Sequence, residues 1–389
     1  MIKSTAHKPR VLLSAGMIQA GHSGVGRYVV ELANRMAAME SIDLYVAGLD
    51  ADRGLFERMA DDRWLSIPAA FGGGVKNLIW HQWHLPRLLR LGHYDLLHIP
   101  SYRRIVGYCP VPQIATVHDC APFHLRDKYG FLRGLFGRHL APWLARRCDR
   151  IVSVSESSKQ DIVKFYHLGA ERVDVVLNGL DHHAYHPMSA EQLASFRQNK
   201  GFNQPYFLYI SRLEHPGKNH LRLIQAYESY REQSGANVQL VLGGAPWLGA
   251  EVIEARVAAS PYRADIRMAG FLAESDLPGW YAAAEALIFP SLMEGFGLPV
   301  IEALACGLRV ATSNCSSLPE VGGAAALYFD PYSTVEIAAA LLTLCRENGV
   351  ERASRIEQGL QQAARYDWDQ AAMATCQLYL KTINVVPSP

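Results

Sequence analysis

In Phe289-Pro290-Ser291-Leu292-Met293-Glu294-Gly295-Phe296-Gly297-Leu298-Pro299, the pattern of residues predicts the end of a strand, then a glycine turn, then the start of a helix. The apolar residues up to Phe289 are typical of a buried strand. Gly295 and Gly297 leave room for a ligand to approach the backbone. Pro299 is tolerated in the first turn of a helix, so we expect a helix to begin near Leu298. The stretch therefore predicts one strand–turn–helix unit of an α/β sheet.

The same alternation of short apolar runs and helix-like segments continues along the chain. It predicts parallel sheets covered by helices on both faces, and it occurs twice. We therefore expect an α/β protein of two Rossmann-like, doubly wound domains facing a cleft. The strand candidates are Val11–Ser14, Leu44–Ala47, Leu96–Ile99, Ile114–Val117, Ile151–Val154, Val173–Leu177, Tyr206–Ile210, Gln239–Gly243, Ile266–Ala269, Ala286–Phe289, Arg309–Thr312 and Ala326–Phe329.

The seam between the domains is predicted in the polar stretch Asp181–Gln204. We expect an N-terminal domain over residues 1–190 and a C-terminal domain over residues 191–366. The apolar-periodic segment Trp368–Ile383 predicts a final helix within residues 367–389, packed on the second domain or back on the first. Ligands of open α/β sheets bind beyond the carboxyl ends of the strands, so chemistry is expected in the loops after them.

Composition excludes several classes of protein. The 389 residues are 49% hydrophobic and 19% charged, with a net charge of +1, which is ordinary for a globular protein and does not indicate nucleic-acid binding. The seven cysteines include no C-x-x-C pair, which argues against structural zinc and a disulfide framework. Met1–Arg10 lacks the apolar stretch of a signal peptide, and no run of about 18 apolar residues occurs. We expect a cytoplasmic protein.

Two carboxylates bracket the glycine turn and the first turn of the predicted helix. Glu294 precedes the predicted helix and Glu302 lies one turn inside it. Eight residues apart, they can hold two polyol groups of one extended ligand, and the N–H groups that open the helix attract an anion. An isolated pair of this kind is more often two solvated glutamates, but the intervening Gly-Phe-Gly-Leu-Pro favours a ligand site.

A second loop carries positive charge after a strand. In Ile210–Asn219, Arg212 offers a fork for two phosphate oxygens and Lys218 a point charge. Together they could clamp a diphosphate and stabilise it as a leaving group. A basic surface loop is the alternative.

Weaker candidates follow strands of the first half. The turn Ser23–Tyr28 contains Gly24 and Gly26 but lacks the third glycine of a dinucleotide fingerprint, so it predicts a close-approach turn rather than an NAD site. His118-Asp119 at a strand end is a candidate for hydroxyl recognition, or His118 merely caps the strand. Asn178-Gly179 is a turn by composition.

Two segments of the first half combine basic and aromatic residues: Lys76–Leu91 and Arg126–Arg150. We expect most of the apolar residues in Arg126–Arg150 to lie in the core. The excess of positive charge leaves open a peripheral contact with an anionic membrane surface, which would be the inner face of the cell membrane.

With these loops placed, the chain resembles the retaining family-4 glycosyltransferases of the GT-B fold over nearly its full length. Glu294–Glu302 matches the family's E-x7-E element, and Ile210–Asn219 matches its phosphate loop. The first turn, V-H-D at 117–119, N-G at 178–179 and S-L-P-E-V-G-G at 317–323 fall in family order. The S-G-V-G form of the first turn resembles a subset rich in bacterial mannosyl- and rhamnosyltransferases.

The resemblance implies that the domain over residues 1–190 binds the acceptor and that the domain over residues 191–366 binds the nucleotide-sugar donor. The helix within residues 367–389 would cross back to the N-terminal domain. The resemblance also implies a role for each matching residue. Arg212, Lys218, Gly24 and Leu298 would bind the donor diphosphate, and Glu302 the ribose. The donor sugar would be held by Glu294, Gly295, Phe296, Gly297 and His118, and the base by Gly270 and Phe271. His118, Glu294, Arg212 and Lys218 would carry catalysis.

The implied reaction moves a hexose, with mannose from GDP-mannose as the first choice, to a glycan or polyprenyl-diphosphate-linked acceptor during cell-surface polysaccharide synthesis. A UDP-sugar or dTDP-rhamnose donor is the alternative. The nucleotide sugar is a co-substrate, and no cofactor is expected. No Asp-x-Asp motif occurs in a matching loop, so we expect no metal. An epimerase, a phosphorylase, or a non-catalytic nucleotide-sugar-binding subunit remain alternatives of other kinds.

Overall fold

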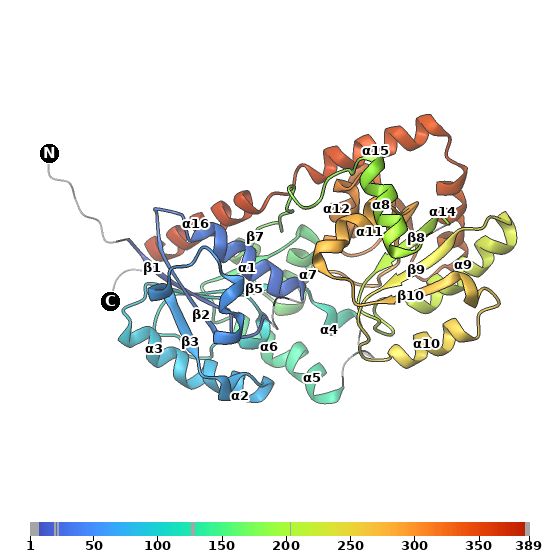
Figure 1. Ribbon diagram of the computed structural model, residues 1–389. Helices are drawn as coiled ribbons and strands as arrows, with labels where there is room; N and C mark the ends of the chain where they lie inside the picture. Colours follow the sequence, from blue (N-terminus) through green and yellow to red (C-terminus); the bar gives the residue numbers. More distant parts are fainter. Residues whose placement is uncertain are drawn as a thin grey trace. The chain divides into compact units, whose positions relative to one another are not determined.

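The computed structural model describes residues 8–18, 21, 23–125, 128, 130–202 and 204–385, except the side chain of Val385. The chain forms two compact units, each considered by itself (Figure 1). Unit 1 comprises Met1–Phe123, Tyr129–Gly179 and Trp368–Pro389, and unit 2 comprises His124–Lys128 and Leu180–Asp367. Within the described ranges, no helix is both long and apolar enough to cross a bilayer.

The change of unit comes at Gly179–Leu180, earlier than the predicted boundary after residue 190. Side chains of the intervening segment explain the difference. Tyr185 is buried against Tyr281 at a ring-centroid distance of 6.2 Å, and His182 Nε2 lies 2.8 Å from the carbonyl of Tyr366. Polar composition alone does not reveal these anchors.

Unit 1 is built on a seven-stranded sheet in the order β3-β2-β1-β4-β5-β6-β7, with every neighbouring pair parallel. Its strands are β1 (Arg10–Ser14), β2 (Asp43–Leu49), β3 (Trp64–Ile67), β4 (Leu96–Ile99), β5 (Gln113–Val117), β6 (Arg150–Ser153) and β7 (Val173–Val175). Its helices are α1 (Gly24–Met36), α2 (Gly74–Ile79), α3 (Leu85–Leu91), α4 (Ala121–His124), α5 (Phe131–Leu135), α6 (Ala141–Ala145), α7 (Glu156–Tyr166) and α16 (Trp368–Val385).

Unit 2 repeats the architecture with a six-stranded sheet in the order β10-β9-β8-β11-β12-β13, also parallel throughout. Its strands are β8 (Tyr206–Ile210), β9 (Gln239–Gly243), β10 (Ile266–Gly270), β11 (Ala286–Phe289), β12 (Val310–Ser313) and β13 (Leu327–Phe329). Its helices are α8 (Ala190–Lys200), α9 (His220–Ser234), α10 (Ala250–Ala258), α11 (Leu277–Ala282), α12 (Leu298–Ala305), α13 (Leu318–Gly322), α14 (Thr334–Arg346) and α15 (Gly349–Ala363). The two doubly wound parallel sheets predicted from the sequence are confirmed.

The edge strand β3 was not predicted. It pairs with β2, where Val46 lies opposite Trp64. Of its four residues only Ile67 is buried, so it lacks the continuous apolar run of the central strands.

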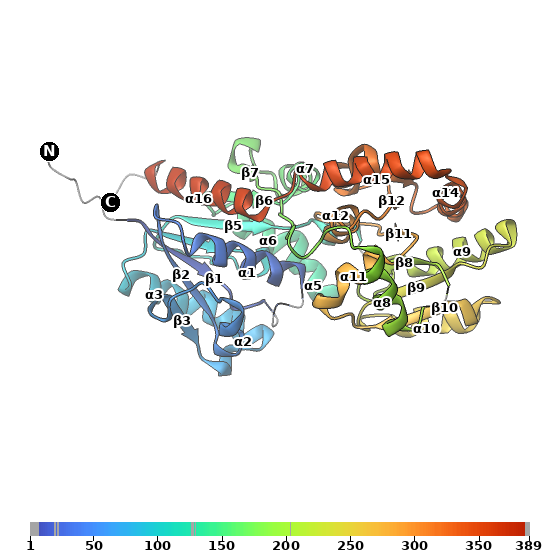
Figure 2. The ribbon, with the colours of Figure 1, turned by 45° about the horizontal axis from the view of Figure 1, so that its top comes forward.

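Helix α16 completes unit 1 and lies beside α1 in both ribbon views (Figures 1 and 2). Trp368 is buried 6.3 Å from the ring of Tyr28. Further along the helix, Tyr379 Oη lies 2.6 Å from His98 Nδ1. His98 Nε2 lies 2.8 Å from Thr116 Oγ1, which lies 3.1 Å from Tyr28 Oη. A buried polar chain thus ties α16 to two strands and to α1.

The predicted core location of the apolar residues in Arg126–Arg150 is wrong for most of them. Phe131, Leu132, Leu135, Leu140 and Trp143 are exposed, whereas Leu144 is buried. The stretch is one helical run, α5 and α6 joined by a π-helical turn at Phe136–Leu140.

Small residues form the face of this run that packs inward. Gly134, Gly137, Ala141 and Ala145 are buried. A Cβ at Gly137 would lie 2.7 Å from Pro122 Cγ, so the helix approaches its neighbour too closely for a larger residue there. The large side chains consequently point outward. Arg126, Asp127 and Tyr129 of the predicted segment lie outside the described residues.

Candidate functional site

The predicted donor-binding residues of unit 2 lie at the ends of β8, β10 and β11, in the loops that follow them and on α12. These strands run parallel in one sheet, so their carboxyl ends meet at one edge. The three strand ends contribute different chemical groups. Cations follow β8, a turn glycine ends β10, and a carboxylate and backbone N–H groups follow β11.

The structure brings Lys218 and Glu294 into direct contact. Lys218 Nζ lies 2.5 Å from Glu294 Oε1, and both side chains are only 16% exposed. Leu292 N donates to the carbonyl of Gly217 at 3.0 Å, which fixes the two loops against each other. Tyr209 Oη donates to the carbonyl of Lys218 at 2.6 Å. The phosphate loop and the first carboxylate of the E-x7-E element therefore belong to one site.

Arg212 has different partners and remains half exposed. Its Nη2 lies 3.3 Å from Oε2 of Glu214, a carboxylate that is 2% exposed. Lys128 Nζ lies 2.6 Å from the other oxygen, Oε1, of Glu214. The guanidinium of Arg212 also lies over the ring of Trp247, 5.0 Å from its centroid. Glu214 and Trp247 thus orient Arg212 while leaving it accessible.

These partners of Arg212 were not predicted from the sequence, for different reasons. Glu214 stands in the phosphate loop itself, so its position was a usable signal. Trp247 follows β9 and is 47% exposed, and an exposed tryptophan just beyond a strand end is also a usable signal. Lys128 lies far away in the sequence, and no local pattern predicts its contact.

Glycines shape the turn between β11 and α12. Gly297 has φ of +111° and precedes the first helical residue, Leu298. A Cβ at Gly297 would lie 2.9 Å from Leu318 Cδ2. Ser317 Oγ donates to the carbonyls of Phe296 at 2.7 Å and Glu294 at 3.0 Å. Leu318 and Ser317 therefore fix the conformation of the turn.

This turn presents its backbone rather than its apolar side chain. Phe296 is buried, with its ring 5.5 Å from that of Tyr366. Within the described residues no side chain caps α12. The backbone N–H groups of the turn and of the helix start are thus the groups suited to bind an anion or a hydroxyl.

Glu302 lies deeper than Glu294. It is 4% exposed and accepts a hydrogen bond from Tyr281 Oη at 2.7 Å. Burial, together with the charge of Glu302, raises the pKa of Tyr281 far above its ordinary value, so Tyr281 remains a donor. The two carboxylates differ accordingly: one pairs with a lysine, and the other is oriented by a tyrosine.

Strand β10 ends at Gly270, which has φ of +67°, and the loop after it begins with Phe271, which is 62% exposed. The carbonyl of Gly270 accepts from Gly244 N at 2.7 Å. Gly244 has φ of +148°, and a Cβ there would lie 1.8 Å from the carbonyl oxygen of Ser211. The loops after β8, β9 and β10 are consequently packed backbone against backbone.

In unit 1, Gly24 is the exposed first residue of α1, and Ser23 Oγ caps this helix by accepting from Gly26 N at 3.0 Å. His118 follows β5, and its Nε2 donates to the carbonyl of Pro100 at 3.0 Å. Its ring meets the edge of Tyr28 at 5.0 Å, which ties it to α1.

His118 is suited to stay neutral. Burial is the main cause that lowers its pKa, and the carbonyl of Pro100 and the charge of Asp119 oppose it. Because Nε2 carries the donated hydrogen, Nδ1 of the neutral ring is an acceptor. The ring can therefore accept a hydrogen bond from a hydroxyl group. Asn178 is buried, and its Oδ1 has no hydrogen-bond partner among the described residues.

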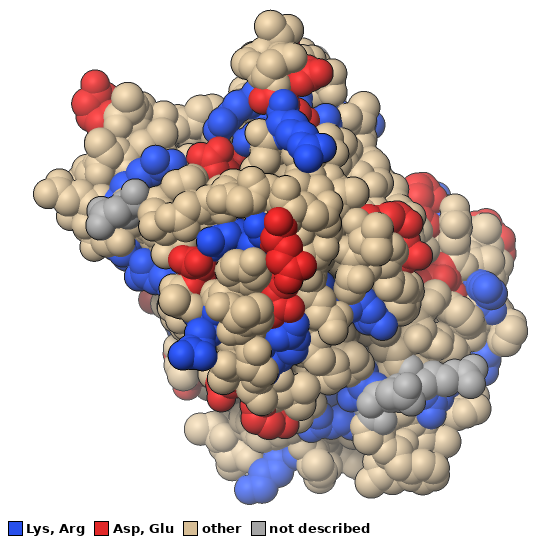
Figure 3. All heavy atoms as spheres, turned by 90° about the vertical axis from the view of Figure 1, so that its right-hand side faces the viewer, with Lys and Arg blue, Asp and Glu red and all other residues tan. Residues whose placement is uncertain are grey.

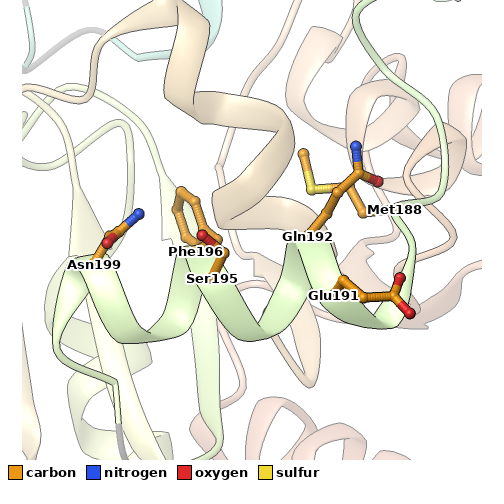
Figure 4. A pocket seen from close by; sticks show the side chains of 6 residues that line it. All are labelled: Met188, Glu191, Gln192, Ser195, Phe196 and Asn199. Carbon is orange, nitrogen blue, oxygen red and sulfur yellow. The ribbon is translucent and has the colours of Figure 1, made fainter.

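A separate hollow of about 450 Å³ runs along α8 (Figure 4). It is lined by Met188, Glu191, Gln192, Ser195, Phe196 and Asn199. None of the predicted donor-binding residues lines it. Its lining combines one carboxylate with amides and apolar groups and includes no basic residue, so it does not fit a diphosphate.

Comparisons with known proteins identify the families that the two halves of the chain resemble. Residues 22–184 match the family described as Glycosyltransferase Family 4, and residues 191–362 match Glycosyl transferases group 1. The chain is 28% identical over 395 residues to the O-antigen chain mannosyltransferase B of Escherichia coli, and the alignment covers 95% of this chain and 99% of the relative. It is 27% identical over 257 residues to the O-antigen chain mannosyltransferase RfbU of Salmonella typhimurium, covering 66% of each. The serotype-specific mannosyltransferase WbdA of Escherichia coli is longer, and the chain spans 34% of it at 26% identity.

Solved structures share the fold over almost the whole chain. A glycosyltransferase from Rickettsia africae has a TM-score of 0.75 at 14% identity, covering 98% of this chain and 100% of that chain. HepE of Anabaena, in complex with UDP and glucose, has a TM-score of 0.73 at 19% identity, with the same coverage. WaaG, a glycosyltransferase involved in lipopolysaccharide biosynthesis, has a TM-score of 0.71 at 16% identity, covering 95% and 99%. At these identities the likeness concerns the fold alone.

Proposed function

Because the chain belongs to the family-4 glycosyltransferases of the GT-B fold, within their bacterial mannosyltransferase subset, we propose that it transfers mannose from GDP-mannose with retention of anomeric configuration. The acceptor is a hydroxyl group of a glycan or a lipid-linked glycan used in cell-surface polysaccharide synthesis. The mannosyltransferase relatives support the sugar, and the family resemblance supports retention.

The contact between Lys218 and Glu294 carries the proposal. The Lys218 ammonium is held in place by this carboxylate at 2.5 Å, and both side chains are only 16% exposed. When a diphosphate arrives, Lys218 can turn its charge to the phosphate oxygens. Glu294 is then available to accept hydrogen bonds from sugar hydroxyls. One ion pair thus separates into a phosphate contact and a sugar contact.

The remaining residues complete a donor site. Arg212 adds a second cation for the diphosphate. The N–H of Leu298, at the start of α12, donates a hydrogen bond to it. Glu302 accepts from the ribose hydroxyls, and the loop at Gly270-Phe271 takes the base.

The reaction proceeds on one face of the sugar. The bond between the anomeric carbon and the diphosphate oxygen breaks, and its electron pair leaves with the diphosphate. The acceptor oxygen bonds to the same face, and its proton passes to the departing phosphate oxygen. Arg212 and Lys218 neutralise the charge that develops on the leaving group, so the transferase is proposed to work without a metal ion. In unit 1, Nδ1 of neutral His118 is proposed to accept a hydrogen bond from a sugar hydroxyl. The backbone at Gly24 is proposed to contact the diphosphate.

The donor is tested first by thermal unfolding in the presence of GDP, UDP, ADP or dTDP. GDP is expected to raise the Tm most, because a nucleotide bound only by the native state stabilises it. A larger shift by UDP or dTDP would move the proposal to a UDP-sugar or to dTDP-rhamnose. Transfer is then measured with the matching nucleotide sugar and lipid-linked glycan acceptors, and NMR of the product reports its anomeric configuration.

A pair of lysine variants distinguishes a role of Lys218 in the site from the general effect of losing an ion pair. Lys200 Nζ pairs with Asp276 Oδ2 at 2.6 Å in the same unit but has no predicted role. Lys218→Ala is expected to lower kcat/KM about 10²- to 10³-fold, whereas Lys200→Ala leaves it nearly unchanged. Equal activity of the two variants would refute the site. Donor binding without turnover on any acceptor would instead favour a non-catalytic nucleotide-sugar-binding subunit.

A further inference from the structure

Two helical stretches of unit 1 expose large apolar side chains. On the first, residues 131–145, Phe131 and Leu132 are 80% and 77% exposed, and Trp143 is also exposed. On the second, residues 74–91, α2 and α3 are joined by a π-helical turn, and Val75 and Trp83 are each 75% exposed. Single exposed apolar residues are ordinary on a soluble protein, but rows of them along two helices mark an interaction surface.

The two stretches flank one loop. A Cβ at Gly107 would lie 3.5 Å from Gln82 Oε1 of the second stretch and 3.6 Å from Leu144 Cδ2 of the first. Tyr108 of this loop is exposed, and together with Arg147 it lines a hollow of about 270 Å³. In Figure 1, α2, α3 and α5 lie along the lower edge of unit 1. We refer to the exposed residues of 74–91, 103–108 and 131–147 as the basic apolar face.

The charge on this face has one sign. Between Asp62 and Asp119 the sequence has a single acidic residue, Asp95, which accepts a hydrogen bond from Arg10 N at 2.7 Å. Between Lys128 and Asp149 it has none, and Asp149, which also lines the hollow, accepts a hydrogen bond from Gln113 N at 2.7 Å. The exposed basic residues of the face are Lys76, Arg87, Arg90, Arg103, Arg133, Arg146 and Arg147. On the face shown in Figure 3, by contrast, acidic and basic residues are interspersed.

Basic and aromatic groups also touch each other on this face. The guanidinium of Arg147 lies 3.4 Å from the centroid of the Trp143 ring. Helices that lie in the plane of a membrane interface combine Trp, Phe and Leu with Arg and Lys in this way. The rings enter the headgroup layer while the guanidinium groups contact lipid phosphates.

We infer that the basic apolar face binds the surface of an anionic lipid bilayer. Phe131, Leu132 and Trp83 enter the interfacial layer, and the arginines that flank them pair with acidic headgroups. Charge complementarity favours this partner. A lipid surface offers many phosphates in no fixed arrangement, so the basic residues of the face can each pair with one. The inference does not depend on transferase activity.

Co-sedimentation of the full chain with vesicles tests this inference. Vesicles of phosphatidylcholine with 30% phosphatidylglycerol are expected to bind the protein, and binding should weaken as salt is added. Replacing Arg133, Arg146 and Arg147 by Gln should lower the partition coefficient about fivefold per charge. The double variant F131S/L132S should lower it roughly tenfold or more. Brominated acyl chains should quench tryptophan fluorescence less in Trp83→Phe than in the parent protein.

Matched variants of unit 2 serve as controls. Val335 and Val350 are 77% and 80% exposed, so V335S/V350S removes equally exposed apolar groups elsewhere and should leave vesicle binding unchanged. Equal binding to pure phosphatidylcholine, or unchanged binding by both face variants, would overturn the inference. A stable dimer in solution that F131S/L132S dissociates would assign the face to a second copy instead of to lipid.

Discussion

His98 gives unit 1 a pH dependence that can be worked out from its surroundings. The ring is fully buried between Tyr379 and Thr116. Burial lowers its pKa from 6.5 to about 3, and the neighbouring His118 contributes in the same direction. The unfolded chain therefore binds a proton at mildly acidic pH that native unit 1 excludes. The stability contributed by neutral His98 is fully present above pH 6.5 and is lost as the pH falls toward 3.

The variant His98→Gln removes this proton uptake. Between pH 7 and pH 5, the unfolding free energy of the parent should fall by about 2 kcal/mol more than that of the variant. A constant cost of the substitution cancels, because only the change with pH is compared. Unfolding in urea is followed by hydrogen exchange of unit 1 peptides, so that unit 1 is measured separately from unit 2.

The exposed His139 provides the control, and His139→Gln should follow the parent at every pH. Parallel curves for His98→Gln and the parent would refute the reasoning. They would mean that His98 takes up a proton in the native state as readily as in the unfolded chain.

Three further substitutions test the donor site of unit 2. Trp247→Ala should lower kcat/KM about fivefold with a loss in kcat, and Trp247→Phe should restore it, because the ring positions Arg212 against the leaving diphosphate. Glu302→Gln should weaken nucleoside-diphosphate binding, measured by calorimetry, roughly tenfold, because a neutral amide accepts weaker hydrogen bonds from ribose. Gly244→Ala places a Cβ against Ser211 and should destabilise unit 2 by at least about 2 kcal/mol in urea unfolding. Gly349→Ala, where no atom lies within 4 Å of the added carbon, should not.

Regular features of the fold could be predicted because they rest on local patterns. Central strands such as Tyr206–Ile210 are continuous apolar runs, and the helix start at Leu298 follows from Gly297 and Pro299. The edge strand Trp64–Ile67 has no such run, because most of its side chains are not buried. Apolar content alone also failed for Phe131 and Leu132, since it does not reveal that glycines and alanines make the inward face of their helix.

The candidate site divides in the same way. Arg212, Lys218, Glu294 and Glu302 could be proposed from residue type and position after strands. Glu214, the partner of Arg212 two positions along the chain, could have been proposed in the same way. The contacts of Lys218 and Glu302 could not, because they join residues distant in sequence. The pairing of Lys218 with Glu294, for example, crosses 76 positions, and it depends on how β8 and β11 are ordered in the sheet.

The place of α16 in unit 1 has a consequence for synthesis on the ribosome. Trp368 and Tyr379 contribute to the core of unit 1, yet they are translated after the whole of Leu180–Asp367. Until they emerge, His98 lacks its tyrosine partner. Domains usually fold in the order in which they are translated. Here the unit that is translated first is completed last. A nascent chain stalled before Trp368 would contain all of unit 2 but would lack the final helix of unit 1.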